Sequence, residues 1–303
     1  MTTVSTCLTQ RLRTWVPAVA LLLGCGGPAH AAWSYSITFS GLSAASSPFE
    51  HSLSSTITSA LDLWTRHLAG GAAIEIEVEL SDSVTRAMAH SITSGFVRDD
   101  GPRQVYEQGL AYEIRTGLDP NGDAADLRIL LNSDYLHNEL WFDPEPAVRS
   151  APVHPDKTDA VSVFAHEFGH ALAFNGWWDD SAGGQQLDFC STWDLNTAYD
   201  GSFLFFIGAN AMALYGGPVP VTAGNNWHVG NATGAGSDLR FDLMNGLAFD
   251  RGMRYDVSAL DLAMLADMGV ALAPVPEPQT GLLLLAGLAG LAGRGRARDR
   301  RRP

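Results

Sequence analysis

The sequence predicts an α+β fold with a small mixed sheet, a central helix, an irregular second half and a C-terminal helix. Residues 74–80, IEIEVEL, alternate strictly between apolar residues and Glu, which is typical of a strand with one buried face. Residues 163–172 carry apolar side chains at helical spacing. Residues 175–257 are rich in Gly, Asn and aromatic residues and give few helical signals. Together these features predict an α+β domain.

The first half supplies most of the regular elements. Residues 33–39 alternate and predict a first strand, and residues 126–132 predict another. A helix is expected over 53–68, because Ile57, Leu61, Trp64 and Leu68 fall on one of its faces. Residues 81–118 have no clear period, and we expect part of this stretch to be helical.

The remaining helices have recognisable ends. A turn-rich, proline-containing stretch covers 143–155, and the next helix is expected to begin near Thr158 or Asp159 and to end at Asn175-Gly176. Residues 258–269 form the last predicted helix, with Ser258 as N-cap and Gly269 as the stop.

The N-terminus, residues 1–31, reads as a secretory signal peptide. Two arginines precede an apolar stretch at 16–23 that is too short to span a bilayer, and Ala29-His30-Ala31 fits a small-x-small cleavage site. Cys25, at the end of LLGC, offers lipoprotein processing as the alternative. We predict ordinary cleavage, because the small-residue site fits its pattern better.

The C-terminus, residues 275–303, has three parts in a fixed order. Val-Pro-Glu-Pro at 275–278 is followed by an apolar run at 281–293 and by six arginines between 294 and 302. This tail resembles the PEP-CTERM sorting signal, which implies removal by a membrane exosortase during export from a Gram-negative bacterium. The alternative is an ordinary weak anchor, since 13 apolar residues fall short of the ~20 that a transmembrane helix needs. The resemblance predicts a secreted or cell-surface protein that is only transiently anchored in the membrane.

The remaining domain, 32–274, is strongly acidic. The whole chain has 19 basic and 33 acidic residues, and the two ends contain eight arginines and two acids, which leaves 11 basic against 31 acidic residues. Such a surface excludes the phosphate backbone of a nucleic acid as partner. Only Cys190 remains after processing, so no internal disulfide is expected.

Residues 119–126, DPNGDAAD, bring Asp119, Asn121, Asp123 and Asp126 close together. A Ca²⁺ loop is one interpretation and a solvated turn before a strand is the other. We predict the turn, because only part of the calcium-loop spacing is present and its bidentate Glu is absent.

Residues 163–176, VFAHEFGHALAFNG, contain an HExxH pattern. His166 and His170 project from the same helix face and can hold one zinc ion. Glu167 can reach a zinc-bound water without binding the metal, and it is the expected general base. The alternative is a helix with two incidental histidines.

A zinc site of this kind needs a third protein ligand. The compact pattern HExxHxxGxxH would require Gly at 173 and His at 176, where the chain has Ala173 and Gly176. A thermolysin-type ligand is excluded, because no Glu lies between Glu167 and Glu277. Asp194 is a candidate, although its surroundings do not match the aspzincin pattern GTxDxxYG.

One histidine follows the motif, His228 in GNNWHVGN, and DLMNG with Met244 comes 16 residues later. A ligand shifted to Asn226 would offer only an amide oxygen, which suits zinc poorly. HExxH, a distant His and a Met-bearing turn resemble leishmanolysin-like metzincins over about 160–270. The resemblance implies zinc on His166, His170 and His228 in a metzincin-like protease domain, with Met244 as the apolar floor beneath the ion.

The resemblance implies an exported zinc endopeptidase acting on protein or peptide substrates. Tyr255 and Tyr215 are candidates for supporting the oxyanion. Two alternatives stay open: a zinc hydrolase acting on other bonds, and an inactive surface or biofilm matrix protein. An intact Glu167 favours an enzyme, because a purely structural site does not need it.

Overall fold

A computed structural model describes residues 33–177 and 188–274; the predicted signal peptide and the predicted tail lie outside these ranges. The fold is α+β with several small sheets. The main sheet has the order β1-β2-β6-β3, in which β1, β2 and β6 are parallel and β3 is antiparallel to β6. Its strands are β1 (Ser34–Ser40), β2 (Ala73–Leu80), β3 (Ala87–Ser91) and β6 (Leu127–Leu131). Strand β3 therefore forms an edge of this sheet, and its outer side is free to pair.

Two helices pack against each other and against this sheet: α1 (Glu50–Thr65) and α4 (Ala160–Leu172). The buried Trp64 indole joins them, since its Nε1 donates to the Ala165 carbonyl at 2.7 Å. Helix α1 begins three residues before the predicted start and ends at Thr65, so Leu68 lies beyond it, bridged to Leu272. Ser258 caps the last helix, α7 (Ala259–Asp267), as the sequence predicts.

The stretch 81–118 contains three strands and, as the sequence predicts, a helical part. After β3 come β4 (Ser94–Asp100), β5 (Arg103–Gln108) and a short helix, α2 (Gly109–Thr116). The hairpin of β4 and β5 is extended by β9 (Phe189–Ser191), which pairs parallel to β5. Strand β4 is mostly exposed and has polar residues on both faces, and the buried positions of β5 include Glu107 and Gln108, which explains why this stretch shows no apolar alternation.

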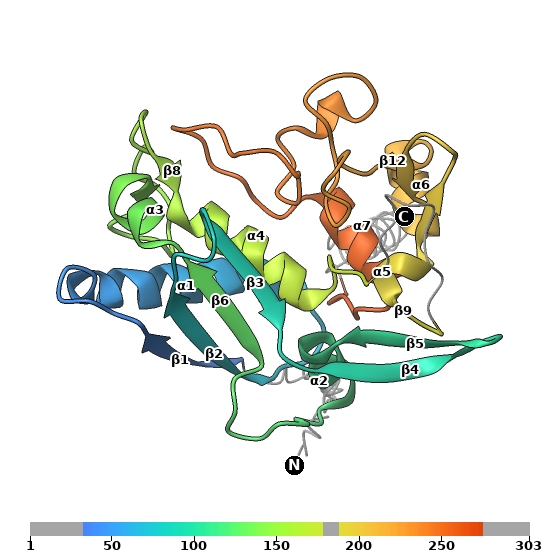
Figure 1. Cartoon of the computed structure of the whole chain (residues 1–303), viewed down its shortest axis with the longest axis horizontal. Coiled ribbons are helices and arrows are strands. Elements are labelled where there is room, and N and C mark those ends of the chain that lie inside the picture. The colour runs from blue at the N-terminus through green and yellow to red at the C-terminus, as the bar shows by residue number, and fades with distance from the viewer. Residues whose placement is uncertain (1–32, 178–187, 275–303) are drawn as a thin grey trace, which may run out of the picture.

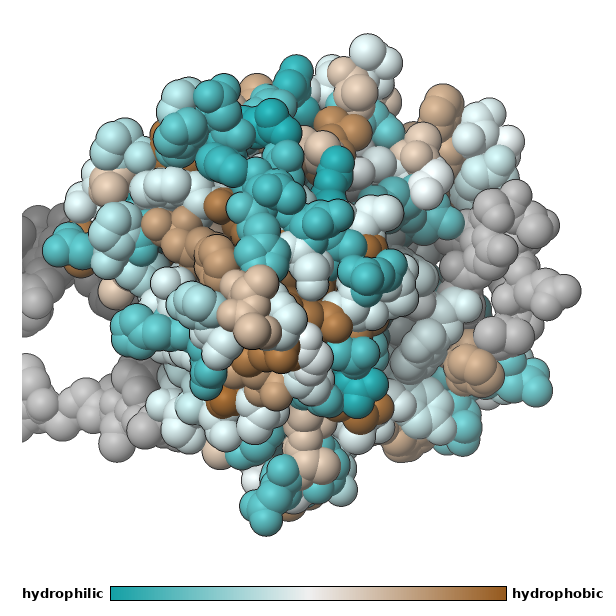
Figure 2. Space-filling model, turned by 60° about the vertical axis from the view of Figure 1, so that its left-hand side comes forward, coloured by the Kyte–Doolittle hydropathy of each residue, from teal (hydrophilic) through white to brown (hydrophobic). Residues whose placement is uncertain are grey.

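The second half is built from short elements joined by turns. Figure 1 shows α4 lying between the main sheet and this second half, which is coloured yellow to red. Hydrophobic side chains also reach the surface, as a band across the face seen in Figure 2 that hydrophilic residues border. The short elements of the whole chain are η1 (Ser47–Phe49), α3 (Ser133–Asn138), β7 (Leu140–Trp141), β8 (Thr158–Asp159), α5 (Thr192–Leu195), β10 (Thr197–Tyr199), β11 (Leu204–Phe206), α6 (Ala209–Tyr215), β12 (Val219–Pro220) and η3 (Ser237–Leu239).

Candidate metal centre

Helix α4 carries the HExxH pattern and is fixed at both ends. Asp159 caps it, accepting from the Ser162 N–H at 3.1 Å, which confirms one of the two predicted caps. The helix ends at Leu172, so the expectation that Asn175-Gly176 would end it is wrong. Gly176 instead allows close packing, because a Cβ there would lie 2.2 Å from Asp194 Oδ1.

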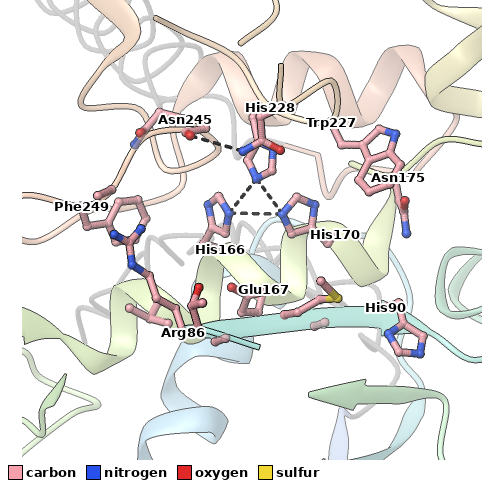
Figure 3. A pocket seen from close by; sticks show the side chains of 18 of the residues that line it. Arg86, His90, His166, Glu167, His170, Asn175, Trp227, His228, Asn245 and Phe249 are labelled. Carbon is pink, nitrogen blue, oxygen red and sulfur yellow. Dashed lines mark hydrogen bonds between the residues drawn. The ribbon is translucent and has the colours of Figure 1, made fainter. Parts of the chain in front are cut away.

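Three histidine side chains converge above this helix. The Nε2 atoms are 3.2 Å apart between His166 and His170, 3.1 Å between His166 and His228, and 3.0 Å between His170 and His228. Figure 3 shows the three rings pointing at one another, with Glu167 on the same helix. The structure thus brings together all three predicted ligands, although 58 residues separate His228 from the helix pair.

Hydrogen bonds at the opposite ring nitrogens fix which atoms carry protons. Nδ1 of His166 lies 2.7 Å from the Leu243 carbonyl, and Nδ1 of His170 lies 2.6 Å from the Phe174 carbonyl. A carbonyl oxygen can only accept, so each Nδ1 holds a proton and each Nε2 of these neutral rings presents a lone pair. Two lone pairs at this separation repel each other, and a single proton on the Nε2 atom of His228 could not bond to both. A cation between the three nitrogens would interact favourably with both lone pairs.

The pKa values of the three histidines also indicate neutral rings. Burial, with a contribution from the neighbouring His170, lowers the pKa of His166 to about 3. Burial lowers the pKa of His170 to about 4 and that of His228 well below its usual value. All three rings are therefore neutral at pH 7, as metal-ligating imidazoles must be.

The spacing of the nitrogens fits a small metal ion. Three points about 3.1 Å apart have an in-plane centre about 1.8 Å from each. Zinc–imidazole bonds are about 2.0–2.1 Å, so an ion just off this plane would reach all three. The Nδ1 atom of His228 has no hydrogen-bond partner of good geometry in the described part of the chain.

Glu167 lies in the cleft beside the histidines and is only 6% exposed. Burial raises the pKa of its carboxyl to about 8, and a backbone hydrogen bond at Ala89 offsets this only in part. A bound cation nearby would lower that pKa again. The cleft has a volume of about 1200 Å³, and residues 85–94, which include the edge strand β3, form one of its walls.

Met244 is fully buried beneath the metal-binding face. A Cβ added at Gly169 would lie 2.5 Å from the Met244 sulfur, so the thioether packs directly on the helix turn between the two histidines. The same turn supplies the Leu243 carbonyl that orients His166. Met244 therefore packs against the helix that carries the histidines, and its role as a floor beneath an ion stays a prediction.

The two predicted tyrosines do not line the cleft. The Tyr255 ring stacks on Phe249 with centroids 4.0 Å apart, and its hydroxyl accepts from the Asp250 N–H. The Tyr215 hydroxyl lies 3.2 Å from Asp238 Oδ1. As placed, neither phenol is available to stabilise an oxyanion.

The alternative ligands are also engaged elsewhere. Asp194 is the acidic residue of a capping box at α5, and its Oδ2 accepts from the backbone N–H groups of Ser191 and Trp177. Asn226 does not line the cleft, and its backbone carbonyl accepts from the Trp193 indole. Asp194 does not belong to the histidine group.

Several residues that orient the histidines or line the cleft could not be found from the sequence. The carbonyls of Leu243 and Phe174 orient the histidines, and a backbone carbonyl leaves no signature in the residue type. Arg86 and Tyr135 line the cleft, and Tyr135 is close enough to Glu167 for that carboxylate to contribute to its raised pKa. Both lie far from the motif along the chain.

Comparison with known proteins identifies the C-terminal tail. Residues 274–301 match the family model of the PEP-CTERM protein-sorting motif. The protein is exported. The motif implies recognition by an exosortase at the tail, which confirms that part of the sequence prediction. No curated protein and no solved structure matches the chain.

Within residues 33–177 and 188–274, no helix has the length and apolar character that crossing a bilayer requires. The predicted apolar run at 281–293 lies outside the described residues, as does the signal peptide.

Proposed function

We propose that the exported domain is a zinc-dependent endopeptidase of metzincin-like architecture. The observation that carries the proposal is the meeting of three histidine Nε2 atoms within 3.2 Å of one another in a cleft. His166, His170 and His228 would hold the ion. Three imidazoles are the ligand set of a catalytic zinc site, whereas structural sites are normally closed by four protein ligands.

Bound zinc would supply Lewis acidity towards a carbonyl and leave one coordination position for water or substrate. The chain's own contribution begins with Glu167, whose carboxylate is positioned to accept a proton from the attacking water and to return it to the leaving amine. Its burial strengthens this exchange, because a carboxylate in a dry site is a stronger base than one in water. The Leu243 and Phe174 carbonyls hold the two helical imidazoles in the ligating tautomer.

The edge strand favours a peptide as substrate. Strand β3 pairs with β6 on one side only, and its residues line the cleft beside Glu167. An extended peptide can add to such an edge through backbone hydrogen bonds, which would align it along the cleft. The cleft volume of about 1200 Å³ leaves room for several side chains.

The test is digestion of casein or gelatin by the purified full chain, with and without a chelator. We expect zinc-restored activity that Glu167→Ala reduces by about 10²-fold or more, the scale of a lost general base. His51→Ala, which removes an exposed histidine of α1, is the matched control and should leave the rate unchanged. Chelator-resistant digestion would refute the proposal. Bound zinc without proteolysis would favour a hydrolase of other bonds, and absence of both would favour the matrix protein.

A further inference from the structure

A second cluster of ionisable side chains, separate from the histidine group, lies where β2 and β6 begin. Carboxylate oxygens of Glu113, Asp119 and Asp126 all lie within 4.8 Å of one another. Glu75 on β2 adjoins them, since its backbone N–H donates to Asp126 Oδ2 at 2.9 Å. We call Glu75, Glu113, Asp119 and Asp126 the acidic cluster.

The predicted turn is present within this cluster. Asp119 Oδ1 accepts from the N–H groups of Asn121 and Gly122, at 3.0 and 2.7 Å, which closes a tight turn. The sequence argument rejected a calcium loop because no Glu stood at the position that the motif requires. The fold supplies two glutamates from elsewhere instead: Glu113 from α2 and Glu75 from the neighbouring strand.

No basic side chain of the described residues forms an ion pair with the acidic cluster. Among the described residues, none of its four members takes part in an ion pair. The basic residues on the same elements are already engaged, Arg115 by Glu107 and Arg128 by Glu77. Four carboxylates thus crowd together with no cationic side chain bound to them.

The carboxyls of Glu113 and Glu75 each lie within hydrogen-bond reach of Asp126, but an ionised carboxylate can only accept, so this contact gives them no donor. Glu113 is only 5% exposed, and its Oε2 is buried with no partner in the described part of the chain. Oε2 of Glu75 is in the same situation, and so is Oδ1 of Asn121 in the turn. A buried carboxylate oxygen without a partner is costly, and native proteins rarely contain one unless a ligand satisfies it. Burial together with the neighbouring carboxylates raises the pKa of Glu113 to about 8.

We propose that the acidic cluster binds one calcium ion. Calcium takes six to eight oxygen ligands in flexible geometry, and carboxylates from separate segments suit it. Magnesium is held less often by protein cages of this kind, and zinc prefers nitrogen and sulfur. The ion ties together β2, the C-terminal part of α2 and the turn before β6. Helix α2 also packs on α4, so calcium stabilises the framework behind the histidines.

The test is calcium binding by the purified full chain after removal of metals, measured by isothermal titration and by the thermal midpoint. We expect one calcium per chain at this site, and a midpoint rise of about 5–10 °C at saturating calcium. Glu113→Gln and Glu75→Gln should each weaken calcium binding about tenfold or more. Both should raise the midpoint of the metal-free chain at neutral pH, because each removes a carboxyl whose ionisation is suppressed by folding. This gain would show that the variants fold.

Glu79→Gln is the matched control, on the same strand and face as Glu75 but outside the cluster, and it should bind calcium as the wild type does. The proposal is overturned if calcium leaves the midpoint unchanged while acid raises it, since the carboxyls would then share protons in place of an ion. Equal calcium binding by wild type and Glu113→Gln would overturn it as well. None of these readouts depends on the histidines or on proteolysis.

Discussion

Burial of Glu167 should make the metal-free protein less stable as the pH rises. In the folded chain the carboxyl has a pKa of about 8, against 4.5 for an ordinary Glu. Between these values the folded state keeps a proton that the unfolded state releases, so stability is lost as the pH rises through this window. At 1.36 kcal/mol per pKa unit, the loss has an upper limit of about 5 kcal/mol above pH 8.

Glu167→Gln removes this titration while keeping the shape of the side chain. Urea unfolding of the metal-free chain at about pH 5 and about pH 8.5 would measure the effect. We expect the variant to exceed the wild type in stability by several kcal/mol at the higher pH and by much less at the lower pH. Other titrating groups are common to both proteins, so the difference between them isolates Glu167.

Added zinc should reduce the difference at high pH, because a cation beside the carboxylate lowers its pKa. Glu79→Gln, a partly buried carboxylate of β2, serves as control and should follow the wild type at both pH values. If wild type and Glu167→Gln lose stability in parallel as the pH rises, burial does not raise the pKa of this carboxyl. The argument that Glu167 is a strong general base in a dry site would then be wrong.

Two further substitutions test the packing around the site. Arg149→Ala should destabilise the chain by about 3–5 kcal/mol in urea unfolding, because Asp159 is 0% exposed and would lose its ion pair. Gly169→Ala should cost about 1–3 kcal/mol and weaken zinc binding in a metal titration. The new Cβ would overlap the Met244 sulfur, and this outweighs the helix-propensity gain of about 1 kcal/mol.

Each substitution has a control of the same kind. Arg240→Ala breaks an exposed ion pair and should change stability by less than about 1 kcal/mol. Gly217→Ala adds a Cβ with nothing within 4 Å and should leave zinc affinity unchanged. If Gly169→Ala binds zinc like the wild type, the contact between Met244 and Gly169 is ordinary core packing and does not position the histidines for the ion.

Local patterns in the sequence located much of the candidate site. Helical spacing placed His166 and His170 on one face, and the capping residue Asp159 was readable from its type. His228 followed from the absence of other ligands and from a family resemblance, since no local pattern links it to the helix. Its position beside the other two rings agrees with that inference.

Features that depend on contacts between residues far apart in the chain could not be predicted from the sequence. Gly176 was interpreted as a helix stop, yet it is small so that Asp194 can approach. Tyr255 was a candidate for the oxyanion, yet it stacks on Phe249 and does not itself line the cleft. Glu113 and Glu75 lie 38 residues apart and meet only because α2 returns to the start of the sheet. Residue type alone cannot indicate such pairings.

The most direct test of the account is the zinc content of the purified full chain and of His228→Ala, with His51→Ala as control. We predict about one tightly bound zinc per chain in the wild type and in the control. His228→Ala should lose most of it while keeping its circular dichroism spectrum. A wild type that binds no zinc after reconstitution, or a His228→Ala variant that retains it, would contradict the three-histidine centre.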